Sequence, residues 1–208
     1  MKIILASDLS FLLKYGYNLT GISKSEMKIG YITTASKVSR SNKDFFENIK
    51  IKIRESGYFF EEMDIEGKNK EELRGFFKDK NIIQIEGGNT FYLLKVIRET
   101  GFDEILKELL NEGKVYMGTS AGSYVMCPTI EVSTWNDDGK DKFGVTDFTA
   151  LNYVPFVLKA HYKDTSGDLI KEKTKTLKYP LHILRDGQGI FCENGVCKFV
   201  GEGEEVKF

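Results

Sequence analysis

The stretch KVYMGTSAGSYVM, residues 114–126, decides the fold prediction for this chain. Its short apolar run, Val115–Met117, stops at Gly118, and the apolar pattern resumes at Tyr124. Between the two runs, Ser120 is surrounded by residues with very small side chains. An apolar run, a turn rich in glycine and a second apolar run predict a strand that turns sharply into a helix, with Ser120 at the turn.

The pattern Gly-x-Ser-x-Gly at such a junction is typical of a nucleophile elbow. Small neighbours let the strand and the helix approach each other and leave the serine hydroxyl exposed. The backbone N–H of Ala121 then points toward a developing oxyanion, at a helix N-terminus that favours negative charge. A structural alternative fits the same residues, because serine is a good N-cap and Ser120 could simply cap the helix.

A second strand-turn-helix pattern precedes this one, in IIQIEGGNTFYLL, residues 82–94. Gly87 and Gly88 lie where the chain leaves the strand, and paired glycines permit unusual backbone dihedrals and close approach. Both turns follow strands of one parallel sheet, so we expect them at the same sheet edge, where such sheets place their sites. Gly88 is therefore the candidate for a second oxyanion donor. The alternative is an anion-binding or purely structural turn.

Expected strands and helices alternate along the first 120 residues. The strands are expected at Lys2–Ala6, Met27–Thr33, Tyr58–Met63, Asn81–Ile85 and Val115–Met117. The helices are expected at Ser41–Ser56, Lys70–Lys78, Thr90–Glu99 and Phe102–Asn111. This alternation predicts an α/β fold with a mostly parallel sheet and helices on both faces, in a single domain of residues 1–208. Farther on, we expect a helix near Asp168–Leu177 and a C-terminal hairpin around Asn194-Gly195.

A serine nucleophile needs a base, and the base needs an orienting carboxylate. The chain has two histidines. His161 is the better candidate, because it follows an apolar segment into a polar stretch and can reach the sheet edge, whereas His182 lies in an apparent buried strand. The segment TWNDDGKD offers three carboxylates, Asp137, Asp138 and Asp141.

Composition excludes several classes of function. A net charge of −1 leaves no electrostatic footprint for nucleic acid. No apolar run approaches the length of a membrane span. Asp8 interrupts the apolar start of the chain and no cleavage site follows, so the expected compartment is the cytoplasm. The spacing of the cysteines gives no zinc pattern.

The three cysteines lead to two expectations. In the predicted hairpin Cys192 lies opposite Cys197, at a separation that would permit a disulfide. We nevertheless predict free thiols, because the cytoplasm is reducing and the closed loop would be small. Cys127, just after the elbow, is expected to be a buried apolar residue and not a nucleophile.

The motifs GGNT-F and G-x-SAG, followed by the apolar segment VPFVLKAHY, resemble those of peptidase family S51, which contains the aspartyl dipeptidases (peptidase E) and the cyanophycinases. The resemblance covers most of the chain, including PTIEVSTWND and LRDGQGI. It implies a three-layer α/β/α sandwich related to the class I glutamine amidotransferases (flavodoxin-like). It also implies a serine hydrolase that needs no metal and no cofactor. Carried over, the roles are nucleophile for Ser120, base for His161, acid for Asp137 or alternatively Asp138, and oxyanion donors for Gly88 and Ala121.

The expected function is therefore dipeptidase-like hydrolysis of short peptides through an acyl-enzyme. Specificity for an N-terminal Asp requires a cation in the pocket, yet the stretch after His161 contains Lys163 and no arginine, so Lys163 or Arg185 would have to supply it. A small peptide is the expected partner, with no nucleic acid and no membrane, and a homodimer is left open. Two other functions fit the same residues: an esterase of the α/β-hydrolase type, and a catalytically silent sensor or binding relative.

Overall fold

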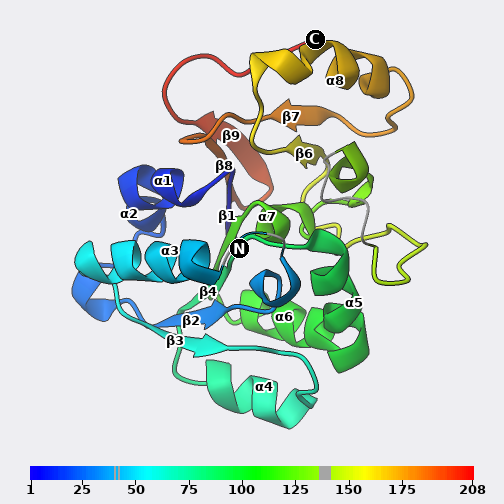
Figure 1. Ribbon diagram of the computed structural model, residues 1–208. Helices are drawn as coiled ribbons and strands as arrows, with labels where there is room; N and C mark the ends of the chain where they lie inside the picture. Colours follow the sequence, from blue (N-terminus) through cyan, green and yellow to red (C-terminus); the bar gives the residue numbers. More distant parts are fainter. Residues whose placement is uncertain (40, 42, 136–141) are drawn as a thin grey trace.

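The computed structural model describes residues 1–39, 41, 43–135 and 142–208. Its main sheet is built from β1 (Lys2–Ala6), β2 (Ile29–Ile32), β3 (Phe60–Met63), β4 (Ile82–Ile85), β5 (Val115–Thr119), β8 (Gly189–Glu193) and β9 (Val196–Val200). The strand order is β3-β2-β4-β5-β1-β8-β9 (Figure 1). The first five strands in this order are parallel, and β8 and β9 add an antiparallel hairpin beside β1. The prediction of a mostly parallel sheet is confirmed.

Helices cover both faces of this sheet (Figure 1). One face carries α4 (Lys70–Phe77), α5 (Thr90–Thr100) and α6 (Phe102–Asn111), and the other carries α3 (Lys43–Glu55) and the consecutive turns α1 (Leu9–Phe11), η1 (Leu12–Gly16) and α2 (Tyr17–Leu19). Successive strand residues point to opposite faces. Ile3 and Leu5 therefore pack in the core with α5 and α6, whereas Ile4 packs in the core with α3 and the Leu9–Leu19 turns. The predicted three-layer α/β/α sandwich is confirmed.

The predicted helices begin and end where local capping residues lie. Asn69 and Glu72 form a reciprocal capping box at the start of α4. Asn89 accepts a hydrogen bond from the Tyr92 N–H at the start of α5, at 2.8 Å. Gly101, with φ of 67°, ends α5 in the left-handed conformation that glycine adopts without strain. The helical turns of Leu9–Leu19 were not predicted, although Asp8 caps the first of them.

The region after residue 128 adds a small parallel sheet beside the main one. It consists of β6 (Val157–Lys159) and β7 (Leu181–Ile183), which are connected through α8 (Gly167–Thr174). The remaining short helices are η2 (Lys24–Glu26), η3 (Ser36–Val38), α7 (Ala121–Tyr124), η4 (Glu131–Trp135) and η6 (Asp164–Ser166). Among the helices of the described ranges, none is long and apolar enough to span a membrane.

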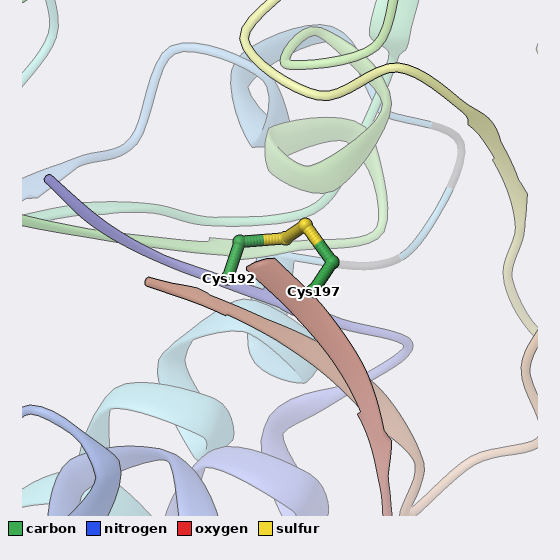
Figure 2. The surroundings of a disulfide bond; sticks show 2 residues. All are labelled: Cys192 and Cys197. Atoms are coloured by element: carbon green, nitrogen blue, oxygen red, sulfur yellow. A yellow bond between two sulfur atoms is a disulfide. The ribbon is translucent and has the colours of Figure 1, made fainter. Parts of the chain in front are cut away.

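The C-terminal hairpin forms as predicted, but its cysteines are joined by a disulfide (Figure 2). Cys192 and Cys197 are paired in the β8–β9 register, with their Cα atoms 4.0 Å apart. Directly opposed residues in a non-hydrogen-bonded position of an antiparallel pair come this close, so the hairpin itself brings the two sulfurs together. The prediction of free thiols, which rested on the expected compartment, is wrong. Cys127 is buried, as predicted, and its burial raises the pKa of the thiol to about 12.

Candidate active site

Ser120 occupies a tight turn between β5 and α7. Its φ of 48° and ψ of −107° are unusual for a residue with a side chain and indicate local backbone strain. A Cβ on Gly118 would lie 2.5 Å from the backbone of Gly122, and a Cβ on Gly122 would lie 2.3 Å from the carbonyl oxygen of Ile85. The two glycines therefore let the strand and the helix approach each other. The Ser120 side chain makes no capping hydrogen bond, so the structure does not use it as an N-cap.

The glycine pair after β4 lies directly beside this serine. A Cβ on Gly87 would be 3.3 Å from the Cβ of Ser120 and 3.9 Å from its Oγ. Gly88 has a φ of 143°, and a Cβ there would lie 2.1 Å from the carbonyl oxygen of Ala35. Only glycine fits at this position, which accounts for the second member of the pair. The register places Gly118 beside Ile85, so the two turns meet at one sheet edge, as expected.

His161 lies just beyond β6 and has a positive φ of 57°. Its backbone N–H donates to Ser7 Oγ at 2.9 Å, and Ser7 Oγ donates to Asp186 Oδ1 at 2.9 Å. The imidazole Nδ1 is 2.6 Å from the same Asp186 oxygen. Hydrogen bonding to His161 is the main cause that holds the pKa of Asp186 below its usual value. This small network thus fixes the backbone of His161, the position of its imidazole ring and the hydrogen-bond partner of Nδ1.

Asp186 was not among the predicted site residues. It follows β7 as His161 follows β6, and these two strands pair in parallel with Lys159 opposite Ile183. The pairing carries both side chains to the same end of the small sheet. An Asp-Gly step after a short apolar strand was visible in the sequence, but the pairing of the two strands was not. The predicted acids Asp137 and Asp138, together with Asp141, lie outside the described residues.

The second histidine is placed elsewhere. His182 lies in β7, where its Nδ1 bonds to the carboxylate of Glu205 and its ring packs edge-on against Phe156. It is absent from the cavity that His161 lines. Of the two histidines, His161 therefore shares a cavity with Ser120.

That cavity has a volume of about 600 Å³. Ser120, His161, Gly87 and Gly88 lie on its wall. One side is apolar and comes from the Leu9–Leu19 turns and α3, through Leu9, Leu13, Phe45, Phe46 and Ile49. In the described part of the chain no hydrogen bond joins Ser120 to the imidazole. Such bonds often form only when substrate is bound.

Two buried charged residues also line the cavity. Glu86 is 2% exposed, and its burial raises the pKa of the carboxyl to about 7. Lys159 is 6% exposed, and its burial lowers the pKa of the ammonium to about 8, against the opposing effect of Asp186. The two cations expected from the sequence, Lys163 and Arg185, do not line the cavity. Arg185 donates two hydrogen bonds to Asp164, and Lys163 is exposed.

Comparisons with known proteins identify the family of this chain. The model of peptidase family S51 matches residues 13–200. This chain belongs to peptidase family S51. It is 28% identical to an uncharacterized peptidase of Pasteurella multocida over 93% of this chain and 94% of that one. It is 34% identical to an uncharacterized peptidase of Listeria monocytogenes over 71% and 72% of the two chains.

A solved structure supports the same assignment to family S51. The crystal structure of a candidate peptidase E from Listeria monocytogenes superimposes with a TM-score of 0.83 at 26% identity, over 97% of this chain and 98% of that one. The protein is thus a hydrolase that belongs to peptidase family S51. Within the described ranges no group of three or more His, Cys, Asp or Glu residues is placed to hold a metal ion.

Proposed function

We propose that this S51 member is a serine peptidase that hydrolyses short peptides through an acyl-enzyme. The observation that carries the proposal is the shared cavity: Ser120, on a strained turn, and His161, already bonded to a carboxylate, open onto the same space. Two turns rich in backbone N–H groups border that space. The arrangement supports nucleophilic catalysis more directly than simple ligand binding.

In the proposed mechanism His161 Nε2 accepts the proton of Ser120 as Oγ attacks the scissile carbonyl. Asp186 keeps the other ring proton on Nδ1 and stabilises the imidazolium that forms. The N–H groups of Gly88 and Ala121 stabilise the oxyanion, each contributing about 3–4 kcal/mol. His161 then protonates the leaving amine, and water releases the acyl group from Ser120.

Asp186 takes the acid role in this proposal because its contact with His161 supports it. The sequence-based prediction of Asp137, with Asp138 as the alternative, stays a prediction. Substituting each of the three carboxylates separately distinguishes them.

The first test is Ser120→Ala. As a nucleophile, Ser120 contributes nothing to stability, so the free energy of unfolding should stay within about 0.5 kcal/mol while kcat falls at least about 10⁴-fold. Peptidase turnover, fluorophosphonate labelling and denaturant unfolding check this. A Ser120→Ala protein that still hydrolyses peptides, in a preparation free of other peptidases, contradicts the proposal. Hydrolysis of aryl esters without dipeptides favours the esterase, and a wild type that the probe does not label favours the silent relative.

We further propose that an acidic N-terminal residue is preferred, as in Asp-X dipeptides, and that Lys159 is the cation that recognises it. The support is a buried ammonium on the cavity wall, 6% exposed. The Lys159 Nζ donates a hydrogen bond to the Ala160 carbonyl at 2.8 Å, which helps to fix the position of the ammonium.

Lys159→Gln tests this specificity. The wild type should cleave Asp-Leu faster than Asn-Leu, and the variant should lose about 10- to 100-fold of that preference, because a charged hydrogen bond to the substrate is removed. Lys52→Gln is the matched control, since Lys52 lines the same cavity from an exposed position. An unchanged Asp-Leu to Asn-Leu ratio in Lys159→Gln would remove Lys159 from substrate recognition.

A further inference from the structure

We propose that the carboxylate of Glu86 binds the free α-ammonium group of the substrate peptide, so that an unblocked N-terminus is a requirement of this site. The inference rests on the proposed peptidase function and names the group that recognises the substrate's N-terminus. It is drawn from the hydrogen bonding, the position and the charge environment of Glu86.

The hydrogen bonding of Glu86 is incomplete. Its Oε2 accepts a hydrogen bond from the Tyr31 hydroxyl at 2.8 Å. Its Oε1 is buried and accepts no hydrogen bond from any of the described residues. The Ser36 hydroxyl lies close enough to Glu86 to lower the pKa of its carboxyl through hydrogen bonding, but it donates its own proton to the Thr33 carbonyl at 2.8 Å. A buried carboxylate oxygen without a donor is costly, so this atom is poised to accept a hydrogen bond from a ligand.

The position of Glu86 suits a group close to the reacting carbonyl. Glu86 immediately precedes Gly87, whose Cβ direction points at Ser120, 3.9 Å from Oγ. Glu86 and Ser120 line the same cavity, together with Tyr31 and Gln84. An α-ammonium lies two bonds from the carbonyl carbon of its own residue. It therefore fits a carboxylate near the nucleophile better than the ammonium at the end of a lysine side chain does.

Among the described residues, the charges that act on Glu86 leave room for a cation from the ligand. On α3, Lys50 is the positive group that acts on it, but the Lys50 ammonium already bonds to Glu47 at 2.5 Å and to Glu62 at 2.8 Å. On β3, Glu62 adds a second negative charge nearby. In the described part of the chain, Glu86 belongs to no cluster that could hold a metal ion. A peptide ammonium supplies the positive charge and the donor together.

The experiment measures binding to the Ser120→Ala protein by calorimetry, so that turnover is not needed. The probes are Asp-Leu and succinyl-leucine, which differs from Asp-Leu only in lacking the α-ammonium group. We expect Asp-Leu to bind about 10- to 100-fold more tightly, the range for a charged hydrogen bond. In Ser120→Ala with Glu86→Gln, the two probes should bind within about threefold of each other.

The matched control removes a different negative charge from the same cavity. Asp8 also lines the cavity, and its Oδ1 accepts from the Gly187 N–H at 2.8 Å. Asp8→Asn retains that oxygen and should preserve the difference between the two probes. N-acetyl-Lys-Leu tests the other source of an ammonium. If it binds as tightly as Asp-Leu and depends on Glu86, the α-ammonium assignment is wrong.

The outcomes separate this inference from the proposed function. Equal binding of Asp-Leu and succinyl-leucine to Ser120→Ala overturns the inference. This comparison does not need the Glu86 variant, so it holds even if that variant fails to fold. A preference for Asp-Leu that survives Glu86→Gln overturns it as well. If the wild type hydrolyses no peptide but the ammonium preference depends on Glu86, the inference stands and the peptidase mechanism fails.

Discussion

At the scale of single residues, the contact between Asp186 and His161 leads to a specific prediction about catalysis. Asp186→Asn should lower kcat by about 10³–10⁴-fold, because an amide neither fixes the same tautomer nor stabilises the imidazolium. Steady-state kinetics on a dipeptide substrate measure the loss. Asp164→Asn is the control, since that exposed carboxylate pairs with Arg185 and is absent from the cavity wall.

The same measurement on Asp137→Asn and Asp138→Asn decides between the two assignments of the acid. A large loss in Asp137→Asn with little change in Asp186→Asn would make the sequence-based assignment the right one. Physically, the sequence could suggest Ser120 and His161 because each follows an apolar strand with its own local pattern. It could not suggest Asp186, because the contact with His161 depends on the pairing of β6 with β7, two strands that are separated in the chain by more than 20 residues.

At the scale of elements, the β8–β9 hairpin carries the disulfide (Figure 2). After denaturation without reduction, one cysteine, Cys127, should react with an alkylating reagent, and after reduction all three should react. Replacing Cys192 and Cys197 by alanine should lower the free energy of unfolding by about 2 kcal/mol, the chain-entropy value for so short a loop. Mass spectrometry and denaturant unfolding measure the two effects.

Peptidase activity is the control for the hairpin, because neither Cys192 nor Cys197 lines the cavity. Three alkylated cysteines without reduction would show that the thiols are free. The sequence predicted the turn at Asn194-Gly195 and, from it, the opposed cysteines. Asn194 and Gly195 both adopt the positive φ that this two-residue turn requires. The prediction for the bond itself was wrong, because the expected compartment and the small loop were given more weight than the short distance that the hairpin imposes.

Other elements were predictable for local reasons. The first core strand, Lys2–Ala6, and the helix Phe102–Asn111 have the predicted bounds, because apolar periodicity and the glycine at position 101 fix them. The Leu9–Leu19 turns were missed, since no single period dominates three short helical segments in sequence. Yet these turns, with α3, supply the apolar side of the cavity. The sheet edge that carries Ser120 was thus easier to predict than the apolar side of the cavity.

At the scale of the whole molecule, the two sheets gather groups from distant parts of the chain into one cavity. Ser7, Glu86 and Ser120 follow β1, β4 and β5 of the main sheet, and His161 follows β6 of the small sheet. Parallel strands end at one edge, so a fold predicted from alternating strands and helices already predicts where the site lies. What it does not predict is the polarity of the interior. A carboxylate and an ammonium, Glu86 and Lys159, remain buried in that cavity.

The buried Glu86 should leave a signature in the stability of the whole protein. Its folded pKa of about 7 lies above the ordinary value of 4.5. Between these pH values the folded state binds the proton more tightly than the unfolded state does, so stability falls as pH rises from about 4.5 to 7. Below pH 4.5 the carboxyl is protonated in both states and the effect vanishes. Above pH 7 the cost reaches its full value, roughly 3 kcal/mol.

Glu86→Gln removes this cost, because an amide of the same shape carries no charge. The variant should gain stability relative to the wild type as pH rises from 4 to 8, by up to roughly 3 kcal/mol. Urea unfolding of both proteins across this range measures the difference, in which the contributions of the ionisable groups common to both proteins largely cancel. A difference that stays flat means that Glu86 does not titrate on folding. A difference that shrinks with rising pH means that the folded protein supplies Glu86 with a cation of its own, and the carboxylate would then not need one from a substrate.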